Sequence, residues 1–341
     1  MKRVKLFLVV FVLLCLGLTT GIAQQTGDYR SAVDGGKWNT VSTWETFNGT
    51  DWVAATAVPG ASGTGNVTIR NGYDVILDVS GKYCKKLIVE AGASLTGDYP
   101  LPTSSIRYIR VTGDLVVVNG TVGDLTTGSG VSVENATESD TIVITGTGTF
   151  APARVRVNSN KSGTTTIFDI DAKFMYTGSS GTGGMAIYPQ TDNNTFIFNA
   201  GKTFTFVNYG NIGVGSSVSS ASAQSVKFIV NGTMDLSQLN SSFTLLSAVG
   251  DTATLIVGST GSIVIGDRFL TTGITEGKSV ISNNGSITVK GTATFTNPDN
   301  YVDGTGSFIL GDGATINIGA EAGLDPLSGP IHYYQNFQSN S

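Results

Sequence analysis

The chain has 341 residues, 45 of them glycine, and only 13% of its residues are charged, giving a formal net charge of −5 at pH 7. About a quarter of the residues are charged in an ordinary soluble domain, so neutral polar side chains must cover most of this surface. An acidic chain without runs of Lys and Arg is a poor partner for nucleic acid or an anionic membrane surface. It also suits acidic polysaccharides poorly, unless a metal ion or a local basic patch intervenes.

Residues 1–23 are predicted to be a secretory signal peptide. Lys2, Arg3 and Lys5 precede the apolar stretch 6–18, and Gly21-Ile22-Ala23 supplies small residues for cleavage. The mature protein would begin at Gln24 and be secreted or held at the outer cell surface. No later segment is long and apolar enough to span a membrane, so the mature form is expected not to be transmembrane.

Cleavage of the signal peptide would leave Cys84 as the single cysteine, which cannot form an intramolecular disulfide. We interpret Cys84 as a partly buried, unreactive small hydrophobe. The alternative is a thiol whose pKa is lowered by the adjacent Lys85 and Lys86.

Residues 24–65 hold all three tryptophans of the chain, Trp38, Trp44 and Trp52. We predict an N-terminal cap, because the first coil of a repeat protein exposes apolar core that an atypical terminal unit must cover. The alternative is a glycan-binding cluster in which these rings stack on the apolar faces of sugars.

From residue 66 to residue 319 the sequence repeats one unit, in which two short alternating apolar runs flank a tight corner. Period-two alternation predicts strands with one buried face, and Asn or Gly at the corner suits tight turns. Each unit is therefore read as strand, corner, strand, and the polar stretch before the next unit as a loop. The second corner residues, spaced 20 to 31 residues apart, are 72, 92, 120, 146, 172, 201, 232, 261, 285 and 313.

Repeats of this length without helical periodicity predict a right-handed parallel β-helix with one coil per unit. Apolar residues are expected to stack inward as columns, and Thr, Ser, Asn and Lys to point outward. Asparagines at the corners are expected to bond one another in ladders. The inward pairs are Val116 and Val118, Ile142 and Ile144, Phe196 and Phe198, Phe228 and Val230, and Ile316 and Ile318.

Three stretches depart from the repeat pattern and are predicted to be loops on the coil: residues 97–110, 178–195 and 216–225. Loops carry much of the function on rigid scaffolds. Residues 320–341 form a C-terminal tail. Either this tail covers the last coil with Ile331, Tyr333 and Phe337, or the natural chain continues beyond it.

The segments GKWNTVSTWE, VTIRNGYDVILDV and KKLIVEAGASLTG resemble secreted β-helical surface proteins of Bacteroidetes-type bacteria. The stretch 66–97 is also similar to the glycine-rich G8 domain of extracellular proteins. The resemblance covers the N-terminal third and implies export and a β-helix. The G8 similarity implies extracellular glycan contexts by analogy of fold.

Catalytic groups are also considered in the sequence, because β-helices often carry polysaccharide lyases and hydrolases. A hydrolase needs paired carboxylates, and Asp169 and Asp171 are the best local pair. A lyase needs a basic side chain, such as Arg154 or Arg156, and often carboxylates that hold Ca²⁺. None of these residues lies in a recognisable catalytic signature. The only histidine, His332, cannot make a His-rich metal site.

The sequence therefore favours a secreted or cell-surface structural, adhesin-like module that contacts extracellular polysaccharide or other surface components. It predicts no cofactor, no metal and no nucleic-acid partner, and leans against an enzyme. The alternative is a polysaccharide-active lyase or hydrolase that uses Asp169, Asp171, Arg154 and Arg156, with Ca²⁺ possible only in that case. A glycan-binding module built on the tryptophans is the third possibility.

Overall fold

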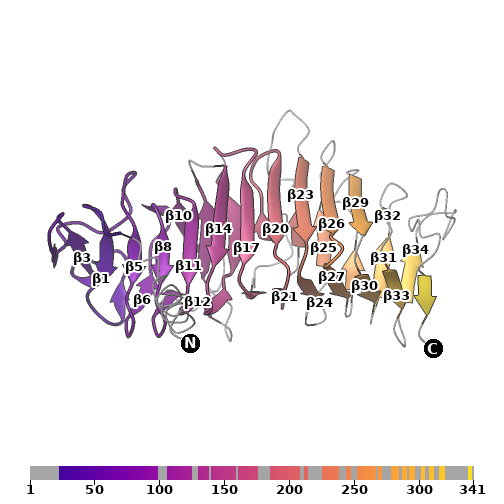
Figure 1. Ribbon diagram of the computed structural model, residues 1–341, viewed down its shortest axis with the longest axis horizontal. Helices are drawn as coiled ribbons and strands as arrows, with labels where there is room; N and C mark the ends of the chain where they lie inside the picture. The colour runs from indigo at the N-terminus through magenta and orange to yellow at the C-terminus, as the bar shows by residue number, and fades with distance from the viewer. Residues whose placement is uncertain are drawn as a thin grey trace, which may run out of the picture.

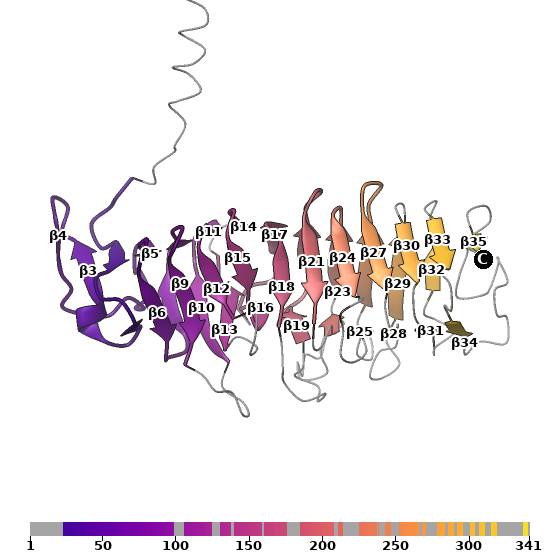
Figure 2. The same ribbon diagram turned by 90° about the horizontal axis from the view of Figure 1, so that it is seen from below.

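The protein is a long stack of coils, with the N-terminal strands at one end and the C-terminal strands at the other (Figures 1 and 2). The computed structural model describes residues 23–98, 106–124, 130–137, 140–158, 160–175, 185–207, 211–213, 225–236, 238, 243–246, 252–265, 268–270, 278–283, 286–289, 292–295, 301–303, 307–310, 315–318 and 337–339. Nearly all ordered elements are strands, so the predicted all-β class is confirmed.

Each regular coil contributes one strand to each of three sheets, here called A, B and C, before the chain returns to sheet A. In the first coil β5 belongs to sheet A, β6 to sheet B and β7 to sheet C, and β8 then pairs in parallel with β5. Parallel pairing of equivalent strands satisfies the backbone groups between coils. The result is the expected right-handed parallel β-helix.

Sheet A has 13 strands, of which three belong to the N-terminal cap. Its strands are β1 (Tyr29–Ser31), β3 (Trp44–Phe47), β4 (Trp52–Ala54), β5 (Val67–Ile69), β8 (Leu87–Val89), β11 (Leu115–Val118), β14 (Thr141–Thr145), β17 (Thr165–Asp169), β20 (Asn194–Phe198), β23 (Ser225–Val230), β26 (Thr252–Val257), β29 (Lys278–Asn283) and β32 (Tyr301–Asp303).

Sheet B has 12 strands and follows sheet A across the tight corner. Its strands are β2 (Gly36–Lys37), β6 (Asp74–Leu77), β9 (Ser94–Gly97), β12 (Thr121–Gly123), β15 (Thr149–Ala151), β18 (Ala172–Phe174), β21 (Thr203–Phe206), β24 (Thr233–Leu236), β27 (Ser262–Ile265), β30 (Ser286–Val289), β33 (Ser307–Leu310) and β35 (Phe337–Ser339).

Sheet C has 10 strands and closes each coil. Its strands are β7 (Lys82–Cys84), β10 (Arg107–Val111), β13 (Val131–Asn135), β16 (Arg154–Val157), β19 (Met185–Tyr188), β22 (Asn211–Gly213), β25 (Phe243–Leu246), β28 (Arg268–Leu270), β31 (Thr292–Phe295) and β34 (Thr315–Ile318). Most of these strands were missed in the sequence, where they fell in stretches interpreted as loops. The exception is β34, which holds the predicted pair Ile316 and Ile318.

The cap is built from β1 to β4 and the 3₁₀ helix η1 (Val41–Thr43). Strand β1 pairs in parallel with β5, while β3 pairs antiparallel with β1 and with β4. The cap thus extends sheet A past the first coil and turns its edge into an antiparallel meander. Among the described residues, no helix is long and apolar enough to cross a membrane.

The core runs along the axis as stacked apolar columns. Four of the five inward pairs predicted from the sequence are fully buried, from Val116 and Val118 to Phe228 and Val230, which confirms them. The side chains of Ile316 and Ile318 lie outside the described part of the structure. From β17 to β23 the core is rich in phenylalanine, and the rings of Phe168 and Phe198 stack 5.1 Å apart. Each such aromatic pair contributes about 0.5–1.5 kcal/mol beyond its buried area.

The glycines at the sheet A to sheet B corner are conformational, for two different reasons. Gly72 has φ of 78°, a left-handed conformation that glycine adopts without strain. At Gly120, a β-carbon would lie 2.2 Å from the carbonyl oxygen of Ala93 in the preceding coil. The second kind of glycine is required by the close stacking of coils rather than by the turn.

Two expectations about polar positions are wrong. Asn119 accepts hydrogen bonds from Thr147, and Asn199 donates one to Asp169, so these corner asparagines bond other residue types rather than one another. The outward face of sheet A also carries a half-buried aliphatic row, which includes Val143, Ile167 and Ile197. Stacked β-branched side chains cover one another on a flat sheet, so outward positions need not be polar.

Of the predicted loops, residues 216–224 and most of 97–106 and 178–184 lie outside the described residues. The remainder includes β10, β19 and the start of β20, which are strands. Of the predicted tail, only β35 is described, and it pairs in parallel with β33 of sheet B. Ile331, Tyr333 and His332 lie outside the described residues.

Candidate functional site

The outward face of sheet C carries a row of charged and aromatic residues that the parallel register brings together. Arg110 on β10 faces Tyr83 on β7 and Glu134 on β13. Glu134 in turn faces Arg156 on β16, which faces Tyr188 on β19. The row therefore crosses five neighbouring strands. It runs parallel to the axis of the β-helix.

Glu134 lies at the centre of this row and has 0% exposure. Its Oε1 accepts a 2.7 Å hydrogen bond from Nε of Arg110 and a further one from the side-chain amide of Asn158. Its Oε2 forms an ion pair with Nη2 of Arg156. A buried carboxylate is expensive unless it is paired and hydrogen-bonded, and here both oxygens have cationic partners.

Tyrosine rings support the guanidinium groups on either side of Glu134. Arg156 lies 3.9 Å from the ring centroid of Tyr108, and Arg110 lies 5.1 Å from those of Tyr108 and Tyr83. Arg110 also donates a 2.8 Å hydrogen bond from Nη1 to the hydroxyl of Tyr83. Cation–π contacts hold the planar groups in fixed orientations. We call Tyr83, Tyr108, Arg110, Glu134, Arg154, Arg156 and Tyr188 the Arg–Tyr face.

A second row on the same side begins with Tyr108 and continues through Ser132 to Arg154. Arg154 lies 5.5 Å from the ring centroid of Tyr188. The Ser132 hydroxyl, Nε of Arg156 and Oε2 of Glu134 are buried and have no hydrogen-bond partner among the described residues, although Oε2 is ion-paired with Arg156. Buried polar groups are nearly always satisfied, so the two unpaired donors mark a place where an added acceptor atom would be stabilised.

The Arg–Tyr face is locally cationic, with three arginines and one glutamate, although the chain carries a net charge of −5. Burial lowers the pKa of Arg110, but its hydrogen bond to Glu134 and the charge of Glu134 together outweigh this effect and raise the pKa above its usual value. Arg110 therefore stays protonated throughout the physiological range. This is the local basic patch that composition alone did not reveal.

The two predicted catalytic carboxylates do not face these arginines. Asp169 ends β17 of sheet A and accepts a 3.1 Å hydrogen bond from the amide of Asn199. Asp171 accepts a 2.7 Å hydrogen bond from the backbone N–H of Thr203. Both act at the corner between sheets A and B, while Arg154 and Arg156 lie on sheet C. The structure does not assemble the four residues into one site.

The tryptophans divide into two kinds. Trp38 and Trp44 are 0% and 1% exposed, with ring centroids 4.9 Å apart. Their indole N–H groups donate to the carbonyl oxygens of Pro59 and Trp38. A ring without exposed surface cannot stack on a sugar. Only Trp52 is partly exposed, and its ring packs against Arg30 and Phe47.

Cys84 occupies the inward face of β7 and is fully buried. Burial raises the pKa of its thiol, so the alternative of a thiolate activated by Lys85 and Lys86 is wrong. In the described part of the chain, no three His, Cys, Asp or Glu side chains gather in a way that could hold a metal.

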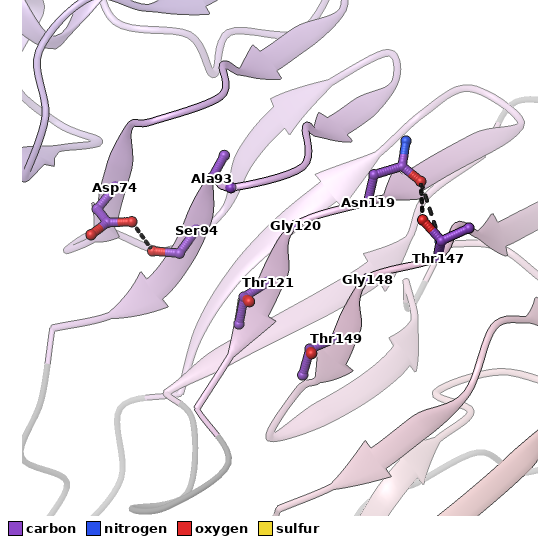
Figure 3. A pocket seen from close by; sticks show the side chains of 10 residues that line it. Asp74, Ala93, Ser94, Asn119, Gly120, Thr121, Thr147, Gly148 and Thr149 are labelled. Carbon is purple, nitrogen blue, oxygen red and sulfur yellow. Dashed lines mark hydrogen bonds between the residues drawn. The ribbon is translucent and has the colours of Figure 1, made fainter.

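A different hollow lies on sheet B, along the corner to sheet A (Figure 3). It has a volume of about 470 Å³ and is lined by Asp74, Gly92, Ala93, Ser94, Asn119, Gly120, Thr121, Thr147, Gly148 and Thr149. The hydroxyl of Ser94 donates a 2.5 Å hydrogen bond to Asp74. This lining offers neutral hydrogen-bonding groups and a single carboxylate, but neither a cation nor an aromatic ring.

Sequence reasoning found Arg154 and Arg156 but missed Glu134, Tyr83, Tyr108 and Tyr188. The segments RYIRV and RVRV alternate with period two, which is a strand signal. Reading them as strands of one sheet would have placed the arginines on a common outward face. Comparison of the chain with protein-family models, curated proteins and solved structures found no match.

Proposed function

We propose that this protein is a secreted or cell-surface β-helix module that contacts extracellular glycans through the Arg–Tyr face of sheet C. The observation that carries the proposal is the row of Arg110, Glu134 and Arg156 between tyrosine rings. Guanidinium and phenol groups donate hydrogen bonds to sugar hydroxyls, and aromatic rings contact the apolar faces of sugars.

Placement outside the cell rests on the signal-like residues 1–23 and on the resemblance of the N-terminal third to exported β-helical proteins. The architecture suits a rigid surface module, because backbone pairing between coils and a continuous core give stiffness without any disulfide. An elongated β-helix also offers a linear polymer many equivalent contacts along one face.

The test is retention of the mature chain, residues 24–341, on a panel of immobilised polysaccharides, combined with a search for newly formed chain ends. We expect retention on at least one glycan and no new chain ends. Loss of retention in the double variant Arg110→Ala/Arg156→Ala would support the Arg–Tyr face as the contact surface. The matched control is Thr121→Ala/Thr149→Ala on sheet B, which should be retained like the natural sequence.

New chain ends would overturn the binding-module proposal in favour of the lyase or hydrolase alternative. Loss of those ends in an Asp169→Asn/Asp171→Asn variant would place that activity at the corner of sheets A and B. Retention that survives the arginine variant but fails after Trp52→Ala would move the contact surface to the cap.

A further inference from the structure

We infer that the ligand of the Arg–Tyr face is an acidic polysaccharide, whose carboxylate or sulfate groups bind at Arg110 and Arg156. This inference rests on the proposed glycan contact and specifies its chemical class. It differs from the expectation based on composition, which made acidic polysaccharides an unfavourable partner for an acidic chain.

The charge balance of the face is the first argument. Arg110 and Arg156 share one carboxylate, that of Glu134, so these three side chains together carry one net positive charge. The face therefore keeps a positive surplus at a place where side chains are largely shielded from water, since the side chains of Arg110 and Arg156 are 24% and 16% exposed. An anion at such a position interacts more strongly than at a fully solvated lysine.

The donor geometry is the second argument. Glu134 and the tyrosines fix the planes of both guanidinium groups, so little side-chain freedom is lost when an anion binds. Among the described residues, Nε of Arg156, the Ser132 hydroxyl and Oε2 of Glu134 have no hydrogen-bond partner, although Oε2 is ion-paired with Arg156. Carboxylate and sulfate oxygens are acceptors and would satisfy the two donors.

The direction of the row is the third argument. Neighbouring strands lie about 4.8 Å apart, so the backbones of Arg110 and Arg156, two strands apart in register, are separated by about 10 Å along the axis. Their guanidinium groups converge on the Glu134 carboxylate between them, so one acidic group can contact both. A linear polymer that lies along the row can also place its sugar rings against Tyr83 and Tyr108, which a small anion cannot do, so a polymer gains by making several contacts.

The experiment measures affinity for polygalacturonate and alginate as carboxylated polymers, dextran sulfate as a sulfated polymer, and dextran as the neutral one. We expect binding to at least one acidic polymer and none to dextran. Arg156→Ala should weaken binding at least about tenfold, because it removes charge-assisted hydrogen bonds to the acidic group. Lys227→Ala, which removes one exposed charge on β23 of sheet A, is the matched control and should change affinity little.

Glu134→Gln is expected to change the affinity for acidic polymers in the opposite direction to Arg156→Ala. It removes the negative charge from the centre of the face and should tighten binding of the acidic polymer several-fold, while Arg156→Ala weakens it. Thermal unfolding of each variant shows whether it is folded. If Arg156→Ala does not fold, the increase in affinity of Glu134→Gln decides the matter. Binding should also weaken in 0.5 M salt, where the Debye length is only about 4 Å.

Each remaining outcome points one way. Binding to carboxylated polymers alone, or to sulfated polymers alone, supports the inference and identifies the acidic group. Binding to dextran but not to acidic polymers overturns it and leaves the proposed glycan contact intact. Binding to no polysaccharide overturns both. Equal losses in Arg156→Ala and Lys227→Ala, or equal binding of poly-glutamate, would show a general charge effect and overturn the inference.

Discussion

On the outward faces of sheets B and C, parallel register aligns equivalent residues into rows, but the two rows differ in chemistry. On sheet B, the parallel register aligns Asp74, Ser94, Thr121 and Thr149. Further along it aligns Thr203 with Thr233 and Ser262. On sheet C, the same kind of register aligns Tyr83, Arg110, Glu134, Arg156 and Tyr188.

The two rows differ in how strongly each side chain depends on its neighbours in the row. A row of small hydroxyls is satisfied by water or by adjacent side chains, so each member is nearly independent. In the row on sheet C, two guanidinium groups two strands apart need the buried carboxylate between them, and the rings of Tyr83 and Tyr108 orient them. Stacked coils therefore turn a repeated position into a coupled site only where the residue types compensate one another.

The largest expected effect tests this coupling. Glu134→Ala removes the carboxylate that pairs with both arginines and should lower the free energy of unfolding by about 3 kcal/mol, the cost of breaking a buried ion pair. Urea denaturation of the mature chain measures this change. A loss as small as that of Thr121→Ala on sheet B would contradict the coupled row.

A smaller effect is expected from Arg156→Lys, which keeps the charge but removes the planar group that lies over Tyr108. Because lysine cannot reproduce the cation–π geometry or the same donor fork, we expect a loss of about 1.5 kcal/mol. Thermal unfolding beside Arg154→Lys, its neighbour in the second row, shows whether orientation or charge alone matters. An unchanged midpoint of thermal unfolding in Arg156→Lys would show that only the charge of Arg156, and not its planar shape, stabilises the row.

The inner face of sheet C makes a pH-dependent contribution through Cys84. Burial raises the pKa of this thiol in the folded state, whereas an unfolded thiol titrates near about pH 8.5. Its contribution is therefore fully present below about pH 8.5 and falls as the unfolded state loses its proton at higher pH, by about 1 kcal/mol at pH 9.3.

The measurement is the free energy of unfolding at pH 7 and pH 9.3 under reducing conditions, for the natural sequence and for Cys84→Val. The difference between the two proteins isolates the contribution of Cys84, because other groups that titrate in this range contribute equally to both. An identical pH dependence in both proteins would show that Cys84 is not buried on the inner face.

The smallest effect is expected on sheet B. Thr121→Ala removes one hydroxyl from a row in which only Asp74 is charged, and should change the free energy of unfolding by less than about 0.5 kcal/mol. It should leave glycan retention unchanged. A large loss of stability in this variant would show that the hydroxyl row is coupled like the row on sheet C, and the contrast between the two faces would disappear.

Much of the fold could be predicted from the sequence because it follows from local chemistry. Alternation at Val116 and Val118 places apolar side chains inward. Corner residues such as Gly72 satisfy a backbone conformation that few other residues accept. These signals need only neighbouring residues, so the repeat, the β-helix and the direction of the core were readable without coordinates.

Sheet C was the part that local signals described least well. Most of its strands follow segments without a repeated corner motif, so β7 and β10 were read as loop. Their outward residues are Arg and Tyr instead of Thr and Ser. A three-residue strand such as β7 carries too little alternation to be recognised alone.

The sequence by itself determined the coil, the inward columns and the tight corners, because each depends on residues close together in the chain. Only the tertiary structure decided which outward residues meet, because register between coils joins positions more than 20 residues apart, such as Arg110 and Glu134. It also separated Asp169 from Arg156 by placing them on different sheets and buried Trp38 and Trp44 in the cap. The sequence specifies the type of each side chain, but which side chains of different coils lie close together depends on how the coils stack.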